Sequence, residues 1–315
     1  MQDAPPHATT FDGLVAAARA AATPETIVAH PCDASSLRGA LEAAEAGLIA
    51  PVLVGPRRKI EAAAQAAGLS LDGREIVDAP HSHAAAERAV ALVRAGRGTL
   101  LMKGSLHSDE LLAAVTARDT GLRTERRISH VYVMELPDRP AVLFVTDGAV
   151  NIFPDLDAKR DIVQNAIDLW RAIGLGAPRV AILSAVETVT TRLPSTIEAA
   201  ALCKMADRGQ ISGGLLEGPL AFDNAIDPEA ARIKGVGGPV AGRAQILVAP
   251  DLEAGNMLAK NLTYMAHAEA AGVVMGARAP IVLTSRADSV RARLVSCAVA
   301  ALFAVARARG ALAGG

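Results

Sequence analysis

Short apolar segments alternate with alanine-rich segments of helical spacing through the first hundred residues of the chain. In order along the chain, strand-like and helical segments occupy residues 26–32, 34–48, 50–55, 56–69, 73–80, 82–96 and 98–104. An order of strand, helix and strand that repeats in this way is typical of a parallel sheet packed between helices. The sequence therefore predicts an α/β fold.

The composition agrees with strands that are buried on both faces. Hydrophobic residues make up 51% of the chain, yet aromatic residues contribute only 3%, so alanine, valine and leucine fill the core. Small and branched side chains of this kind suit the continuous apolar strands of a parallel sheet. A length of 315 residues favours two domains over one.

The middle of the chain predicts a second α/β layer that begins near residue 141. Residues 129–136 and 140–148 flank a proline-bounded turn and predict an antiparallel hairpin. Further helical and strand-like segments follow at residues 155–174, 179–185, 194–209, 211–218, 244–251, 252–272 and 273–276. The glycine- and proline-containing segment 228–244 predicts a long exposed loop.

Charge, cysteines and hydropathy exclude several classes of protein. The net charge is -1, from 32 basic and 33 acidic residues, so we expect no nucleic-acid partner. Three widely spaced cysteines fit a reducing compartment better than a disulfide framework. The amino terminus has no signal-peptide pattern, and no apolar run is long enough to cross a membrane. These features predict a cytoplasmic protein without a membrane partner.

Polar side chains gather just after the predicted strands, where open parallel sheets bind their ligands. They are Lys103, Ser105, His107, Ser108, Asp147, Asn151, Glu187, Ser195, Asp223, Asn224, Asp251, Asn256, Lys260, Ser285, Arg286 and Asp288. This pattern predicts a polar ligand.

Three of these places combine a hydroxyl group with the start of a helix, which suits an anion such as phosphate. Ordinary capping is the alternative at two of them. It is favoured at Ser195, which has the spacing of a capping box with Glu198, and it stays open at Ser108, which precedes acidic residues. The third place has Arg286 and Asp288 close to Ser285, which exceeds what capping requires. We therefore interpret residues 284–289 as functional.

Other motifs are absent from the sequence or are weak. There is no phosphate-binding lysine loop, no dinucleotide fingerprint and no nucleophile elbow. His81 and His83 have no supporting carboxylate cluster and favour a solvated loop over a metal site. His30 is interpreted as a buried, hydrogen-bonded histidine, and Cys32 has no evident activating partner.

Three segments together resemble the phosphate acetyltransferase and phosphate butyryltransferase family. They are "KGSLHSDELLAAV", "SAVETVTTRLPSTIEAAALCKMADRGQISGGLLEGPLAFDNAI" and "APDLEAGNMLAKNLTYMAHAEAAGVVMGARAPIVLTSRADS". Within them, "EGPLAFDNA", "PDLEAGN" and "SRADS" occur in the family's order and at its intervals, and the resemblance extends from "VAHPCD" to the end of the chain.

The resemblance implies a fold, an activity and partners. It implies two α/β domains with a cleft between them, as in the isocitrate and isopropylmalate dehydrogenases. The first domain would comprise residues 1–140 and 285–315, and the second, which dimerises, residues 141–284. It implies transfer of a short acyl group, acetyl or butyryl, between coenzyme A and inorganic phosphate to give an acyl phosphate. It implies a homodimer with no bound cofactor and no metal, in which coenzyme A is a substrate.

The resemblance also assigns candidate residues. The family's Ser–Arg pair corresponds to Ser285 and Arg286. The aspartate that acts as base in acetyl-type members corresponds to Arg291 or Ala292 here, and Asp288 is the nearest carboxylate. The acetyl-type arginine in the "KGSLHS" helix is missing, so Lys103 is the candidate to supply that charge.

A direct transfer mechanism follows from these residue types. A free thiol has a pKa near ~8.5, so a carboxylate such as Asp288 takes its proton. Ser285 hydrogen-bonds the thiol or the oxyanion, and Arg286 holds the phosphate. Asp223, Asn224, Asn256 and Lys260, with Ser105, His107 and Ser108, are candidates to bind and orient the substrates.

Two other functions stay open at this point. One is a metal- and NAD(P)-dependent decarboxylating dehydrogenase of the same architecture, with Asp147, Asp223 and Asp251 as metal ligands. The other is a protein that binds coenzyme A or an acyl phosphate without turnover. The second function stays open because Arg291 or Ala292 stands where acetyl-type members of the family have the aspartate that acts as base.

Overall fold

The structure is a computed structural model that describes residues 9–283 and 288–310. Contacts within the chain divide it into two compact units. Of the described residues, the first unit comprises Phe11–Arg126 and those from Ala271 onward, and the second comprises Arg127–Ala270 with Thr9 and Thr10. These limits differ from the expected domain boundaries at 140/141 and 284/285, and the assignment of domains stays a prediction.

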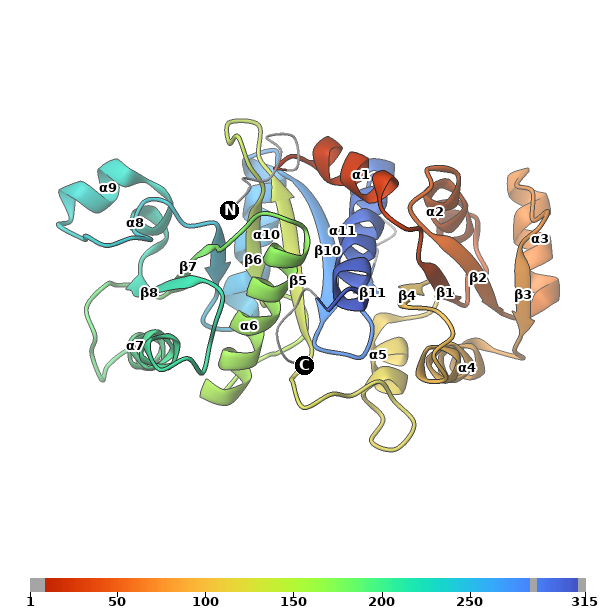
Figure 1. The fold of residues 1–315 in the computed structure, drawn as a ribbon, viewed down its shortest axis with the longest axis horizontal. Coiled ribbons are helices and arrows are strands. Elements are labelled where there is room, and N and C mark those ends of the chain that lie inside the picture. The colour runs from red at the N-terminus through yellow and green to blue at the C-terminus, as the bar shows by residue number, and fades with distance from the viewer. Residues whose placement is uncertain (1–8, 284–287, 311–315) are drawn as a thin grey trace. The chain divides into compact units, whose positions relative to one another are not determined.

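The first unit is built on a mostly parallel sheet (Figure 1). Its strands are β1 (Glu25–Ala29), β2 (Ala50–Gly55), β3 (Glu75–Asp78), β4 (Leu100–Lys103), β10 (Glu269–Met275) and β11 (Ile281–Val282). They lie in the order β3-β2-β1-β4-β11-β10, and only β10 runs antiparallel to its neighbour β11. The parallel βαβ order predicted from the sequence is confirmed.

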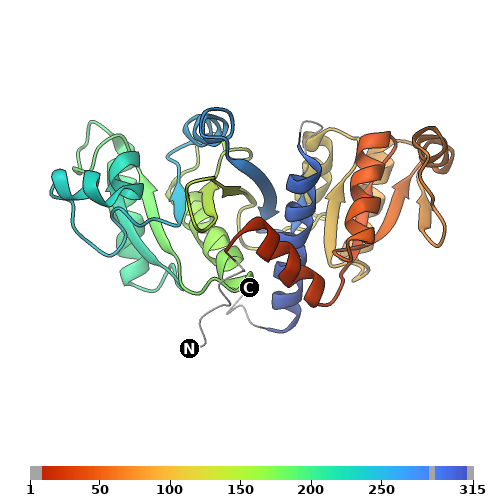
Figure 2. The same cartoon turned by 90° about the horizontal axis from the view of Figure 1, so that it is seen from above.

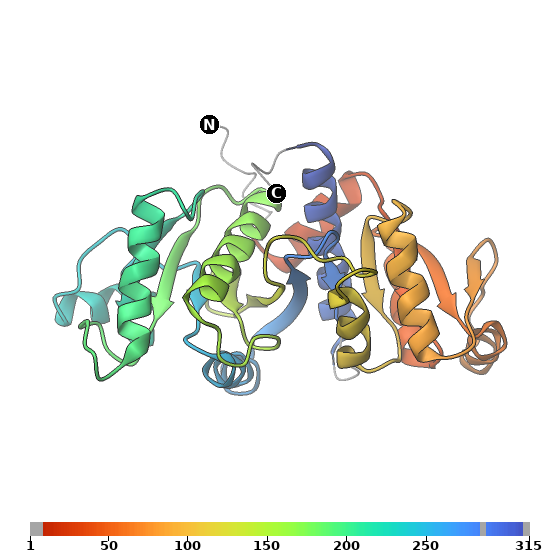
Figure 3. The same cartoon turned by 90° about the horizontal axis from the view of Figure 1, so that it is seen from below.

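Helices cover both faces of this sheet. They are α1 (Phe11–Ala20), α2 (Ala34–Glu45), α3 (Arg57–Ala67), α4 (Ser82–Arg94), α5 (Ser108–Thr116) and α11 (Val290–Ala308). Figure 2 shows α1, α2 and α11 on one face, and Figure 3 shows α4 and α5 on the other. The central strands β1, β2 and β4 are buried on both sides, which explains their continuous apolar sequences.

The second unit is a mixed sheet that begins with the predicted hairpin. Its strands are β5 (Ser129–Glu135), β6 (Leu143–Thr146), β7 (Arg179–Leu183), β8 (Leu215–Leu220) and β9 (Ile246–Val248). β5 and β6 pair antiparallel, and β6, β9, β7 and β8 then follow as parallel neighbours.

Successive residues of β6 point to opposite faces of the sheet. The helices of this unit are α6 (Leu156–Ala172), α7 (Pro194–Asp207), α8 (Phe222–Ile226), α9 (Pro228–Ile233) and α10 (Leu252–Met265). Phe144 contacts Trp170 of α6 edge to face, with ring centroids 5.0 Å apart. Leu143 and Val145 belong to a separate buried cluster that includes Leu262 of α10. The alternation therefore assigns α6 and α10 to different faces.

Three local predictions are wrong. The helix expected over residues 252–272 ends at Met265, and β10 begins at Glu269. Segment 228–244 is not wholly an exposed loop, because α9 occupies its start and Val240 and Ala244 are buried. The capping box at Ser195 does not form either. Leu193 is the N-cap of α7 and gives no side-chain cap, while Ser195 Oγ lies 2.9 Å from Ser184 Oγ and Glu198 pairs with Lys159.

Among the described residues, no helix is both long enough and apolar enough to span a membrane.

A buried histidine, His130, lies in β5 of the second unit. Its imidazole packs edge to face on Tyr132 and has a buried Nδ1 with no hydrogen-bond partner among the described residues. Burial lowers the pKa of His130 to about 4, against a weaker opposing influence of the Asp147 carboxylate. The folded unit therefore holds this imidazole neutral.

We expect the second unit to lose stability as the pH falls from 7 to 5. The folded pKa of His130 is lower than its unfolded pKa, so the unfolded chain gains the proton and is favoured at low pH. The free energy of unfolding should drop by roughly 2 kcal/mol over this range. Urea unfolding followed by the fluorescence of Trp170, the single tryptophan, measures it. The variant His130→Phe should lose most of this pH dependence, and an unchanged slope would contradict the assignment.

Candidate active site

Three neighbouring strands of the first unit end at one edge of the sheet. β1 pairs in parallel with β4, with Ala29 opposite Lys103, and β11 pairs in parallel with β4 on its other side, with Val282 opposite Met102. The segments that follow these strands therefore leave the sheet at the same edge. Ser285 and Arg286 follow β11 but lie outside the described residues.

A hydrogen-bond network ties the ends of β1 and β4 together around His30. The carbonyl of His30 accepts the N–H of Ser105 at 2.8 Å and the hydroxyl of Ser105 at 2.8 Å. Ser105 Oγ also lies 3.1 Å from His30 Nδ1 and accepts the N–H of Cys32 at 3.3 Å. Ser105 is thus a residue that fixes His30, as well as a predicted substrate contact.

The backbone at His30 is strained. Its φ is +55°, in the left-handed region that non-glycine residues rarely occupy. Such a conformation costs about 1–3 kcal/mol and is kept only where the surroundings enforce it. The hydrogen bonds from Ser105 and Cys32, and the one that His30 N–H donates to Val54 at 2.6 Å, do so here.

Glycines on both neighbouring strands allow this close approach. A Cβ on Gly104 would lie 2.4 Å from the carbonyl oxygen of Ala29 and 2.5 Å from the backbone of His30. A Cβ on Gly55, at the end of β2, would lie 3.3 Å from His30 Cα. No side chain fits between the ends of β1 and β4, so position 104 needs glycine.

The other predicted residues after β4 lie close to this network in the chain. Lys103 is half-buried and donates to the carbonyls of Gly104 and Leu106, each at 3.3 Å. His107 is the N-cap of α5 but makes no side-chain cap, and both it and Ser108 are exposed. Lysine charge and uncapped helical N–H groups at this edge suit an anionic substrate.

The start of α11 carries Asp288. Asp288 is half-buried and its carbonyl accepts Nη1 of Arg293 at 3.1 Å, while Ser289 caps α11 by accepting the N–H of Ala292 at 3.0 Å. Arg291 points instead to α1, where it pairs with Asp12 at 2.9 Å and lies over the ring of Phe11.

Asp223 and Asn224 follow β8 in the second unit and have contrasting surroundings. Asp223 is exposed and pairs with Lys234 at 2.9 Å, and the hydrogen bond from this ammonium group lowers the pKa of Asp223. Asn224 is fully buried, and neither its Nδ2 nor its Oδ1 has a partner within the described part of the chain. A buried amide without partners is costly, so Asn224 fits a role in contacting a ligand.

Asn256 and Lys260 lie on α10 but do not share one environment. Asn256 is half-buried and donates to the carbonyl of Gly148 at 3.0 Å, which ties α10 to the turn after β6. Lys260 is exposed. Their shared role in substrate binding stays a prediction.

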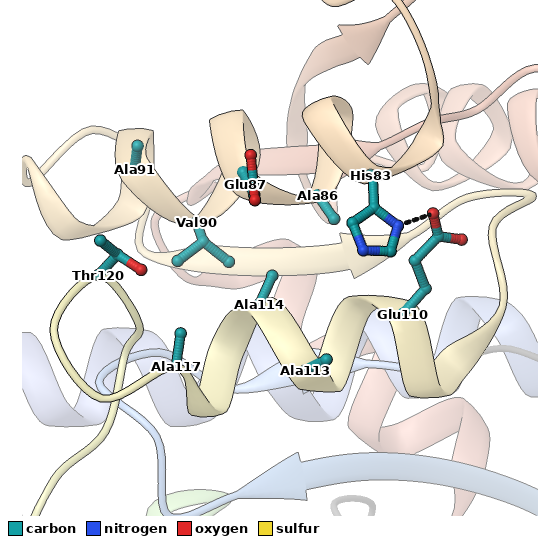
Figure 4. Close-up of a pocket in the computed structure, with 10 residues that line it drawn as sticks. All are labelled: His83, Ala86, Glu87, Val90, Ala91, Glu110, Ala113, Ala114, Ala117 and Thr120. Atoms are coloured by element: carbon teal, nitrogen blue, oxygen red, sulfur yellow. Dashed lines mark hydrogen bonds and ion pairs between the residues drawn. The ribbon is translucent and has the colours of Figure 1, made fainter.

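A groove of about 470 Å³ lies between α4 and α5 (Figure 4). Its lining is mostly alanine, with Val90, and its polar end is the contact between His83 Nδ1 and Glu110 at 2.9 Å. The carboxylates of Glu87 and Glu110 line it, so it does not suit an anionic substrate. The described residues contain no group of three or more histidines, cysteines or carboxylates arranged to hold a metal.

Comparison with known proteins decides the family. The family model described as phosphate acetyl/butaryl transferase matches residues 81–301. The chain belongs to this family. Membership confirms the resemblance found in the sequence and, with it, the acyltransferase class.

Individual members of the phosphate acetyl/butaryl transferase family are also close to this chain. A phosphate acetyltransferase of Rhizobium meliloti is 72% identical over 303 residues, which cover 96% of each chain. A phosphate butyryltransferase of Clostridium acetobutylicum is 40% identical and covers 94% of this chain and 98% of its own. The crystal structure of a branched-chain phosphotransacylase from Enterococcus faecalis is 29% identical, has a TM-score of 0.77, and covers 89% of this chain and 99% of that chain. The mixed α/β fold is therefore similar to that of phosphotransacylases.

The cysteines of this family member are poor nucleophiles. Burial raises the pKa of Cys32 to about 11, with Lys59 opposing it, and raises that of Cys297 to about 12. Burial also raises the pKa of Cys203 to about 11. Because the thiolate is the reactive form, these thiols are unreactive near neutral pH.

Sequence reasoning missed the role of His30 as the centre of the strand-end network. It interpreted His30 as a buried, hydrogen-bonded histidine, whereas the structure shows a half-buried, hydrogen-bonded one with a left-handed backbone. A positive φ at a non-glycine residue has no sequence signature. The glycine at 104, directly after an apolar strand, was the available signal.

Gly104→Ala should destabilise the first unit by about 1–3 kcal/mol, because the added methyl group overlaps the backbone of Ala29 and His30. Gly237→Ala is the matched control, since a Cβ there meets nothing within 4 Å. Thermal unfolding followed by circular dichroism compares the two variants. Equal melting temperatures would show that the strand ends tolerate a side chain.

Proposed function

We propose that the protein transfers an acetyl group reversibly between coenzyme A and inorganic phosphate, giving acetyl phosphate. The observation that carries this proposal is the 72% identity to a phosphate acetyltransferase over 96% of both chains. The 40% identity to a phosphate butyryltransferase makes butyryl the second acyl group. Coenzyme A and phosphate are substrates here, and no other cofactor is required.

The predicted catalytic residues fit this reaction by chemistry. Arg286 binds the phosphate with two hydrogen bonds, and Ser285 hydrogen-bonds the thiol or the oxyanion. Asp288 accepts the proton of the thiol. The support for this assignment is that β11 ends beside β4, so the segment after β11 starts near Lys103, Ser105, His107 and Ser108.

The predicted residues of the second unit, Asp223, Asn224, Asn256 and Lys260, orient the substrate. Asn224 offers a buried donor and a buried acceptor, the pair of groups that an amide of the coenzyme A arm satisfies. Asp223 is held by Lys234, and Asn256 and Lys260 lie on α10. The two-domain arrangement with an interdomain cleft, like that of the isocitrate and isopropylmalate dehydrogenases, remains a prediction from the resemblance.

The transfer is direct, without an acyl-enzyme. The three cysteine thiols have raised pKa values, and the sequence contains no nucleophile elbow. Binding two substrates in reacting positions then supplies much of the rate.

The comparisons do not favour the two rival functions. Decarboxylating dehydrogenases need a cluster of carboxylates for a divalent ion, and the described residues contain no such cluster. A binding protein without turnover does not account for the close identity to a named acetyltransferase.

Release of coenzyme A from acetyl-, propionyl- and butyryl-coenzyme A, with and without phosphate, tests the function. We expect release to depend on phosphate and kcat/KM to be about tenfold or more higher for acetyl than for butyryl, since each added methylene changes the fit to a pocket. A chelator should leave the rate unchanged. Phosphate-independent release contradicts the proposed reaction, and strong inhibition by a chelator favours the metal-dependent rival.

The protein forms a homodimer through the second unit, and we place it in the cytoplasm. Large exposed apolar side chains of the described residues lie in this unit, with Val290 as the exception. On α10, Met257 and Tyr264 are exposed on the side away from the buried Leu262, and Met265 is exposed in the last turn. Exposed apolar side chains on a helix that already buries another face indicate a second contact surface. We propose that a second copy of this chain covers it.

Tyr264→Glu should convert the dimer into a monomer, because it introduces a charge into the proposed apolar interface. Gln65→Glu, at an exposed position of α3 in the first unit, is the control and should leave the dimer intact. Sedimentation velocity at micromolar concentration distinguishes the two states. A Tyr264→Glu variant that sediments as a dimer would exclude α10 from the interface.

A further inference from the structure

His30 occupies the end of β1, next to the end of β4, and its ring is held by one residue of that neighbouring strand end. Its Nδ1 lies 3.1 Å from Ser105 Oγ. Its other ring nitrogen, Nε2, has no hydrogen-bond partner in the part of the chain that the structure describes. The side chain is half-buried, so Nε2 is held in a fixed position without being sealed in the core.

The hydrogen bonds of Ser105 decide which ring nitrogen of His30 carries the proton. The single hydroxyl proton of Ser105 is donated to the carbonyl of His30 at 2.8 Å. Its oxygen then acts as acceptor for the N–H of Cys32 and for His30 Nδ1. Nδ1 must therefore carry hydrogen, and a neutral imidazole has an unshared electron pair on Nε2.

Burial favours this neutral form. Burial lowers the pKa of His30, and Lys59 of α3 lowers it further. Glu110 of α5 and Asp33, the N-cap of α2, raise it by a smaller amount. At neutral pH the imidazole is therefore able to accept a proton.

We propose that His30 is a catalytic base of the acyl transfer and that its Nε2 takes the hydroxyl proton of the attacking phosphate. This inference rests on the proposed function and adds a residue that the sequence analysis did not place in the site. It assigns the phosphate to the edge where β1, β4 and β11 end.

In the proposed step the acyl group moves from the sulfur of coenzyme A to an oxygen of phosphate. An oxygen of hydrogen phosphate attacks the thioester carbonyl, its proton passes to Nε2, a C–O bond forms and the C–S bond breaks. The thiolate of coenzyme A leaves and is protonated, so the proton lost by phosphate is gained by sulfur. In the reverse direction the imidazolium returns the proton to the departing phosphate, while Asp288 takes the proton of the thiol.

The surroundings favour phosphate over the thiol as the partner of His30. The ammonium groups of Lys59 and Lys103 lie at the same side of the sheet, where β2 and β4 end, and a dianion gains from both.

The variant His30→Asn tests the base without disturbing the fold. Asparagine tolerates a positive φ, and its amide nitrogen replaces Nδ1 as donor to Ser105. We expect kcat for acetyl-coenzyme A and phosphate to fall by about 100-fold or more, with KM for acetyl-coenzyme A within about twofold of the parent. A kcat within about twofold of the parent would overturn the proposal.

Chemical rescue separates a base from a structural residue. His30→Gly suits the left-handed backbone and leaves room for added imidazole, which should raise its rate about tenfold or more. His83→Ala, on α4, and Arg286→Ala are the controls, and neither should respond to imidazole. A folded His30→Gly that does not respond overturns the assignment.

Nitrogen-15 spectra of histidine-labelled protein provide a readout besides activity. The parent should show one neutral imidazole that is protonated on Nδ1, and this signal should be absent from His30→Asn. In the parent, the Nε2 signal of this imidazole should shift when phosphate is added. Protonation on Nε2, or no response to phosphate, overturns the proposal. If the parent spectra behave as expected but no coenzyme A is released, the proposed function fails while phosphate binding at His30 stands.

Discussion

The ends of β1 and β4 are held together beyond the last residues of both strands, and the candidate site of the first unit depends on that contact. Gly104 donates its N–H to Ala29 at 2.8 Å, and Ser105 donates its N–H to His30 at 2.8 Å. The contact exists because Gly104 has no Cβ that would meet the backbone of β1. His30, with its left-handed backbone, takes part in the same contact, so the strained residue and the glycine at 104 lie together.

Because the central strands of the first unit are buried, the polar side chains that could bind a ligand lie at the strand ends. The strands of the first unit are covered on both faces by helices, and their apolar residues leave no place for a polar ligand within the sheet. Ser105, His107 and Ser108 become available where β4 ends and α5 begins. His30 and Gly104, whose backbones are restricted, therefore lie at the strand ends where the proposed acyl transfer takes place.

The sequence predicted the regular elements of this fold far better than its local exceptions. The βαβ order and the hairpin of β5 and β6 follow from apolar periodicity and turn residues, which are local properties. The capping box at Ser195 failed because Ser184, eleven residues earlier, offers its hydroxyl, and a tertiary contact of this kind has no local pattern. The role of His30 was missed for the same reason, since Ser105 is 75 residues away. Of the site, residue types at strand ends were predictable, but their mutual contacts were not.

The position of Arg291 explains why proton transfer would involve a residue outside the last segment. In acetyl-type members that the sequence resembles, an aspartate acts as base at the position of Arg291 or Ala292. Here Arg291 pairs with Asp12 and lies over Phe11, so it anchors α1 to α11, and a carboxylate in its place would face Asp12 and repel it. Ala292, in the first turn of α11, is buried, and a charge there is costly. The helix thus uses these positions for packing, and the proposed base for phosphate, His30, comes from the end of β1.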